Sequence, residues 1–130
     1  KVKTDPEALA VFVRAGSEEE AAAIGHCLVE KRLAAGVSIT ENLQSLCPEK
    51  GEIKQGSEVL LMIGTRRPRL KKLVRHVEKL HSGGSPEIIP FSMLQTSKPY
   101  LEWLQANTCR RFGWRRLWRL LRAASVAYGV

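Results

Sequence analysis

Along residues 8–106 the apolar residues alternate between short strand-like runs and longer helix-like repeats, and this alternation constrains the chain more than any other feature. A strand points successive side chains to opposite faces, whereas a helix returns to the same face every three to four residues. The patterns predict strands at 8–14, 37–46, 52–65 and 87–94, and helices at 18–33, 68–80 and 99–106.

The first predicted helix has a clear start and a clear inward face. Ser17 followed by Glu20 is a capping box, which supplies partners for backbone N–H groups at a helix start. The inward stripe is expected to consist of Ala21, Ile24 and Leu28. Two small residues beside it are expected to let the helix approach a sheet closely, namely Ala22 and Gly25.

The second predicted helix begins at Pro68, because proline is favoured in the first helical turn. Its apolar residues follow the helical repeat and predict one buried face, made of Leu70, Leu73, Val74, Val77 and Leu80. Its solvent-facing side is expected to carry Arg69, Lys72, His76 and Lys79.

The segment between these helices predicts a long hairpin. Apolar and polar residues alternate from Val37 to Leu46, and residues 47–51 contain proline and glycine, which favour a turn. The returning strand ends in five consecutive apolar residues at 59–63. Such a run is typical of a central strand that is covered on both faces.

This order of elements predicts an α+β fold, a ferredoxin-like βαββαβ sandwich with a long hairpin between its second and third strands. Right-handed crossovers place both helices on one face of a four-stranded antiparallel sheet. Two helices leave the second face open, and the hairpin exposes its edge. We therefore expect copies of the chain to associate and bury both surfaces.

Charge divides the chain into a nearly neutral domain and a basic tail. The chain has 130 residues and a formal net charge of +8, but residues 110–130 contain six arginines and no acidic residue. We expect an N-terminal extension at 1–7, one domain at 8–109 and the tail at 110–130. Apolar runs are too short for a transmembrane helix, and residues 1–9 lack the apolar stretch of a secretory signal.

The three cysteines, Cys27, Cys47 and Cys109, are far apart in the sequence and odd in number. No pair has the close spacing of a zinc or redox motif. A reducing compartment is therefore expected, which favours the cytoplasm, with membrane association as an alternative through the tail.

Four segments, in this order and spacing, resemble the CutA family of divalent-cation tolerance proteins. They are EKRLAAGV at 30–37, SEVLLMI with the following Thr65, PEII at 86–89 and YLEWL at 100–104. The resemblance covers roughly residues 8–108 and suggests a divergent relative of the animal members, in which Gly36 replaces a common cysteine. It implies a ferredoxin-like fold that assembles into a tight homotrimer through its long hairpins.

The resemblance also implies a non-enzymatic protein that binds copper or another divalent cation. Consistent with this, no carboxylate is paired with a plausible nucleophile in the sequence. The ligand positions proposed for bacterial relatives correspond to Val13, His81 and Glu87, so the cysteine ligand is missing here. His81 and Glu87 remain the candidate metal ligands, and Cys27 or Cys47 of a neighbouring copy is the candidate third donor.

His81 and Glu87 also have a structural interpretation that stays open. His81 stands where the second helix is expected to end, and a cation is favoured at a helix C-terminus. Glu87 then becomes a solvated residue at a strand edge. The Ser82–Ser85 segment precedes a strand rather than a helix, so we interpret it as a flexible turn and not as a phosphate loop.

The tail predicts a basic amphipathic helix over 110–124. One face gathers Trp114, Leu117, Trp118, Leu121 and Ala124, and the other gathers Arg115, Arg119 and Arg122. Such a helix binds an anionic membrane, a grooved protein partner or its own trimer, and a disordered extension is the structural alternative. By resemblance, animal relatives are linked to acetylcholinesterase, so a related protein is a candidate partner. Nucleic acid is disfavoured because no base-reading module is present.

Overall fold

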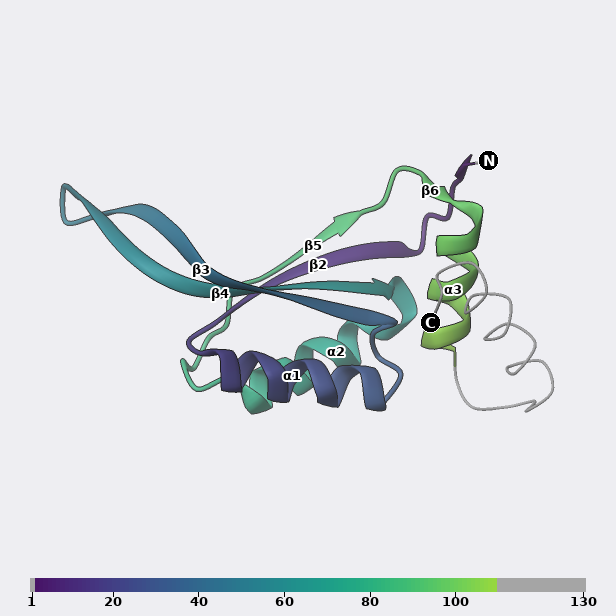
Figure 1. Cartoon of the computed structure of the whole chain (residues 1–130), viewed down its shortest axis with the longest axis horizontal. Coiled ribbons are helices and arrows are strands. Elements are labelled where there is room, and N and C mark those ends of the chain that lie inside the picture. Colours follow the sequence, from purple (N-terminus) through teal and green to yellow (C-terminus); the bar gives the residue numbers. More distant parts are fainter. Residues whose placement is uncertain (1, 110–130) are drawn as a thin grey trace.

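The computed structural model describes residues 2–109, with side chains from residue 4. The elements are β1 (Val2–Lys3), β2 (Ala8–Ala15), α1 (Glu18–Glu30), β3 (Gly36–Glu49), β4 (Glu52–Arg66), α2 (Arg67–Leu80), β5 (Ile88–Ser92), β6 (Thr96–Ser97) and α3 (Lys98–Thr108). Four strands form an antiparallel sheet in the order β3-β4-β2-β5, and α1 and α2 lie together on one face of it (Figure 1). This arrangement confirms the predicted ferredoxin-like fold. The predicted tail helix lies outside the described residues.

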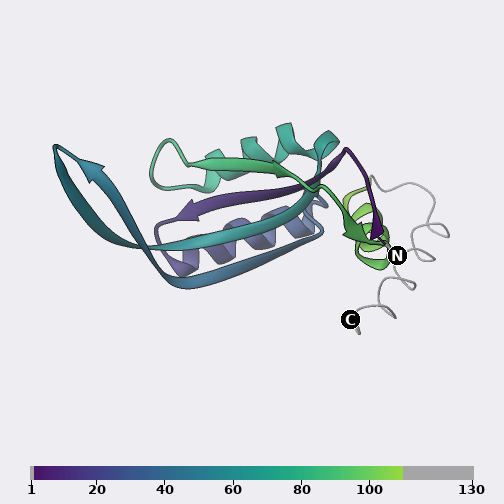
Figure 2. The same cartoon turned by 90° about the horizontal axis from the view of Figure 1, so that it is seen from above.

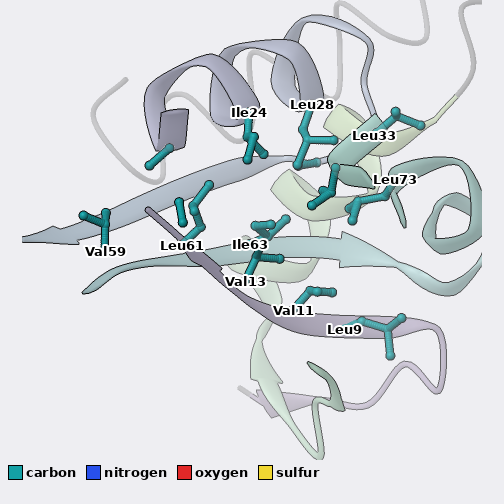
Figure 3. Packing of buried hydrophobic residues seen from close by; sticks show 14 residues of the cluster. Leu9, Val11, Val13, Ile24, Leu28, Leu33, Val59, Leu61, Ile63 and Leu73 are labelled. Carbon is teal, nitrogen blue, oxygen red and sulfur yellow. The ribbon is translucent and has the colours of Figure 1, made fainter. Parts of the chain in front are cut away.

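The core lies between the sheet and the two helices, as Figure 3 shows. Alternate residues of β2 and β4 point toward the helices, and each helix packs one apolar stripe against them. The fully buried side chains include Val11, Val13, Ile24, Leu28, Leu61, Ile63, Leu73 and Val77. Full burial of each larger side chain contributes about 1.5–3 kcal/mol. The predicted inward stripe of α1 is therefore confirmed.

The two small residues beside that stripe behave differently. Gly25 is buried, and a Cβ there would lie 3.4 Å from Val37 Cγ1, so this glycine allows the predicted close approach to β3. Ala22 is exposed to solvent, and the prediction that it faces the sheet is wrong. The reason is its position on the helix, one residue beyond the buried Ala21 and about 100° around the axis.

Among residues 2–109, no helix covers the opposite face of the sheet, and Figure 2 looks onto this face with α1 and α2 behind the strands. Cross-strand pairing places Phe12 beside Met62 of β4 and Ile89 of β5 on this face. Met62 is 39% exposed and Phe91, on the same face, is 49% exposed. β4 is an inner strand of the sheet, as predicted, but in a single copy only its helical face is covered.

Helix α1 ends at Glu30, three residues before the predicted end. Arg32 has a φ of 59°, in the left-handed region. The Leu33 N–H donates to Leu28 O at 2.8 Å, and the Arg32 N–H donates to Val29 O at 3.1 Å. These two bonds form a Schellman motif, which stops the helix. The apolar repeat missed this end because the left-handed residue is not a glycine.

The hairpin turn is shorter than the sequence suggested. Residues 47–51 were expected to form the turn, but Pro48 pairs with Ile53 inside the β3–β4 ladder. The turn is confined to Lys50 and Gly51, with φ values of 50° and 82°. A two-residue turn with positive φ at both positions matches the twist of its strands, and Pro48 is tolerated because β3 is an edge strand. The hairpin consequently extends well beyond the helices (Figure 1).

Helix α3 lies at the end of the sheet, where Leu101 and Leu104 form a second apolar cluster with Ala8 and Ala35. Nearby, β1 pairs with β6, so residues 2–3 of the predicted N-terminal extension join a small two-stranded sheet. None of the helices between residues 2 and 109 is long and apolar enough to cross a bilayer.

The contact of α3 with the sheet depends on a missing side chain at Gly36. A Cβ at this position would lie 2.7 Å from Trp103 Cη2, which is closer than side chains pack. We expect Gly36→Ala to push Trp103 away and to lower the free energy of unfolding by about 1–3 kcal/mol, as measured by urea denaturation. Gly56→Ala is the matched control, because its Cβ would meet Ser45 Oγ at an ordinary 3.6 Å. Equal stabilities of the two variants would contradict this packing.

Candidate functional site

The two predicted metal ligands both contact Arg14, the second-last residue of β2. His81 is the C-cap of α2, and its Nε2 lies 2.9 Å from the Arg14 carbonyl oxygen. Glu87 precedes β5, and its Oε2 lies 3.2 Å from Arg14 Nε. The fold brings these residues to one place because the end of α2 and the start of β5 both meet the end of β2.

Both ring nitrogens of His81 have backbone partners. The Arg14 carbonyl accepts a hydrogen bond, so Nε2 is the protonated nitrogen, and Nδ1 then accepts from the Gly83 N–H at 3.0 Å. A neutral imidazole has one donor and one acceptor nitrogen, so this pairing uses both. Coordination of a metal ion by His81 therefore requires one of these bonds to break.

The carboxylate of Glu87 shares the Arg14 guanidinium with a second acid. Arg14 Nε lies 3.3 Å from Glu58 Oε2, in addition to its contact with Glu87. A cation approaching Glu87 must compete with this arginine. Arg14 and Glu58 were not predicted from the sequence, although strand alternation offered a signal: Arg14 follows the buried Val13 and so points to the other face of the sheet.

The third position of the implied ligand set supplies no donor. Val13 is fully buried in the core and pairs with Ile88 of β5. Across the side chains described from residue 4 to 109, no group of three His, Cys, Asp or Glu residues gathers as a metal site. Cys27 is half-buried and Cys47 is exposed, and both are free thiols. The donors of a single copy therefore do not fit a complete copper site.

Glu20 fixes the loop that carries His81. The first bond of the predicted capping box is present, since Ser17 Oγ accepts from the Glu20 N–H at 3.2 Å, but the return bond of the Glu20 carboxylate goes to Gly16 instead of Ser17. The Glu20 carboxylate accepts from the Gly16 N–H at 2.8 Å and from the Ser82 N–H at 2.5 Å. The Ser82 side chain and the Gly16 N–H hold the pKa of Glu20 at about 2, below its usual 4.5. The turn after α2 is thus tied to the start of α1.

The structure thus combines a long hairpin on a ferredoxin-like sheet with a terminal helix at the end of the sheet, and its class follows from comparison with known proteins. Residues 9–107 match the family model described as CutA1 divalent ion tolerance protein. The chain belongs to this family.

Curated relatives from distant organisms support this membership. The chain is 38% identical over 98 residues to the divalent-cation tolerance protein CutA of Thermus thermophilus, covering 75% of this chain and 95% of the relative. It is 36% identical over 99 residues to the human protein CutA, covering 76% of this chain but only 55% of the human protein.

Solved structures give the same result. The Thermus thermophilus Cut A1 structure superposes with a TM-score of 0.73 at 36% identity, covering 78% of this chain and 99% of that one. The CutA1 structure from Oryza sativa gives a TM-score of 0.75 at 28% identity, with 84% and 100% covered.

The lowered pKa of Glu20 makes the stability of the fold depend on pH. A carboxylate whose pKa falls on folding stabilises the native state above its unfolded pKa, here near 4.5, and this stabilisation is lost as the pH falls toward 2. We expect Glu20→Gln to lower the free energy of unfolding at pH 7 and to converge with the unaltered chain below pH 4.5, as measured by urea denaturation across pH.

Glu19→Gln is the matched control, because it removes the same charge from the same helical turn. Glu19 makes no described side-chain hydrogen bond within residues 4–109, so its pH curve should run nearly parallel to that of the unaltered chain. A parallel curve for Glu20→Gln as well would show that the contact with Ser82 does not stabilise the fold.

Proposed function

We propose that this chain acts as a non-enzymatic homotrimer in tolerance to divalent metal ions, and that it binds copper weakly. The open apolar face of the sheet is the observation that supports the association of copies. Large side chains on this face remain in water in a single copy, among them Met62, Ile89 and Phe91. Its family is named for divalent ion tolerance rather than for a reaction.

The open face has the chemistry of an interface between copies. The rings of Phe12 and Phe91 pack edge to face with centroids 5.0 Å apart, which forms a firm apolar surface. Beside them a hollow of about 390 Å³ is lined by Met62, Tyr100 and Trp103, among other residues. Contiguous apolar surface of this kind usually marks a site of association. The edge strand β3 adds backbone groups that a neighbouring strand can pair with.

We expect copper to bind only to the assembled protein, because one copy offers only two of the required donors. Imidazole and carboxylate suit Cu(II), and His81 and Glu87 are the donors that one copy offers. Binding must displace Arg14 from Glu87 and break one hydrogen bond of His81, and both steps oppose it. The exposed thiol of Cys47 near the hairpin turn is the candidate donor from a neighbouring copy. We therefore expect micromolar or weaker affinity.

The basic tail favours a second candidate function, an interaction or anchoring protein. Residues 110–130 contain six arginines and no acid. Each arginine near an anionic leaflet contributes about 1 kcal/mol, and three tails on one trimer would add their modest affinities. The partner in this case is an anionic membrane or an acidic protein surface.

Trimer formation should depend on the open face. Light scattering is expected to give three times the 14.5 kDa chain mass at micromolar concentration. Phe91→Lys places a charge on the open face and should lower this mass toward that of one copy. Val29→Lys on α1 is the matched control, because Val29 is similarly exposed, 45% against 49%, but lies on the helical side. A single-copy mass for the unaltered chain would contradict the trimer.

Copper binding should depend on His81. We expect His81→Ala to lower the affinity for Cu(II) by about tenfold or more in calorimetric titration, because an imidazole donor is lost. His26→Ala is the matched control, since His26 is exposed on α1 and away from Arg14.

The same preparations separate the two candidate functions. A variant with all six tail arginines changed to glutamine should keep its copper affinity if metal binding is the function. No copper uptake by the unaltered chain, together with anionic-vesicle binding that this variant loses, would instead support the anchoring function.

A further inference from the structure

A basic cavity of about 380 Å³ opens at the far end of the helical layer from His81. It lies where the C-terminal ends of α1 and α3 meet the side of α2, toward the α3 end of the molecule in Figure 1. Four cationic side chains line it, namely Lys31, Arg32, Arg69 and Lys72, and Glu30 is the one acid among its lining residues. Neither the metal proposal nor the open sheet face uses this cavity.

The two guanidinium groups are held in place by carbonyl oxygens at helix ends. Arg32 Nε donates to Cys109 O at 2.9 Å, and its Nη2 donates to Ala106 O. Arg69 Nε donates to Arg32 O at 3.2 Å, and its Nη2 donates to Lys31 O at 3.4 Å. A ligand that meets these groups therefore finds positive charge that is already ordered.

Arg32 occupies a backbone position where an arginine is unfavourable. Its φ of 59° lies in the left-handed region, which glycine adopts most easily. Glycine at this position would relieve the backbone but remove the guanidinium from the cavity. Strain of this kind is typical of functional sites, where the side chain outweighs the cost to the backbone.

Three of the four cations that line the cavity form no ion pair with another described residue. Among the ion pairs between residues 4 and 109, none involves Lys31, Arg32 or Lys72. The C-termini of α1 and α3 each bring about half a negative charge, and Glu30 brings one more, which is less than the three positive charges of Lys31, Arg32 and Lys72.

The charges at the start of α2 are unfavourable for this helix. Its first turn holds no acidic residue and its N-cap residue, Arg66, makes no capping side-chain bond, although a helix N-terminus prefers negative charge. The basic residues near the start of α2 therefore repel its own dipole. An anion bound beside them would offset both this repulsion and the excess charge of the cavity.

We propose that this cavity binds a small anion that carries two or more phosphate groups. Arginine and lysine are the side chains that proteins use for phosphate, and two hydrogen-bonded guanidiniums with two exposed ammonium groups suit adjacent phosphates. A volume of about 380 Å³ lies in the range of small-molecule sites. Its concave shape favours a small ligand over a bilayer or a nucleic-acid duplex.

Inorganic pyrophosphate is the probe, titrated into the full chain and followed by amide chemical shifts in NMR at about 0.15 M salt. The arginines of the tail also attract anions, so a residue-specific signal is needed. We expect saturable shifts at the amides of Lys31, Lys72 and Cys109. Lys31→Ala combined with Lys72→Ala should lower the affinity for pyrophosphate, measured from these shifts, by about tenfold or more, because two phosphate partners are lost.

The matched control removes the same charge from the same region. Lys71→Ala combined with Lys79→Ala changes two exposed lysines of α2 outside the cavity, and the affinity should change less than about twofold. Lys31→Gln combined with Lys72→Gln keeps most of the side-chain length but removes both charges, and it should reproduce the alanine result if packing is not the cause.

Three results would overturn the proposal. One is the absence of saturable shifts at the cavity amides with millimolar pyrophosphate. Another is an equal loss of affinity in both double variants, which would show general attraction to a basic protein. The third is a shift of the same amides with anionic vesicles or a DNA duplex but not with pyrophosphate, which would assign the surface to a polyanion. Copper affinity is measured in parallel, so failure here is distinguishable from failure of the metal proposal.

Discussion

Both helices pack on the same face of the sheet because right-handed crossovers leave no other choice for this order of elements. The helical side buries alternate residues of β2 and β4, and the other residues of the same strands must then face the open side. Phe12 and Met62 illustrate this constraint, since each is one position away from a fully buried neighbour. The apolar run at 59–63 is therefore one feature with two uses, the core of one copy and the surface on which copies are proposed to meet.

The repeats of apolar residues predicted the element order and the core because burial acts on every turn of a helix and every second residue of a strand. They failed where a single backbone angle decides the outcome. Arg32 and Lys50 both adopt positive φ without being glycine, and so the end of α1 and the hairpin turn were displaced. Arg69 shows a related limit, because a residue expected to face solvent instead donates to carbonyls at the end of α1.

The candidate site was predictable only through family resemblance, which named His81 and Glu87 but not their partners. Arg14 and Glu58 meet because of the register between β2 and β4, and Ser82 meets Glu20 across more than sixty residues. Contacts of this kind depend on tertiary structure and leave no local pattern. Charge counting had a similar limit: the domain is nearly neutral as a whole, yet the sequence of α2 holds six basic residues and a single acid.

The two ends of the helical layer differ in the sign of their charge. At the start of α1, Glu18, Glu19 and Glu20 face the positive end of the helix, and the nearby loop is held by a carboxylate. At the other end, Arg32 and Arg69 donate to backbone carbonyl oxygens at the ends of α3 and α1, where positive charge is favoured. The basic cavity is lined by the helical layer and the end of α3, whereas the proposed contact between copies uses the opposite face of the sheet. The two surfaces still share one element, because Trp103 of α3 lines the hollow at the proposed contact and Cys109 at the end of α3 lines the cavity.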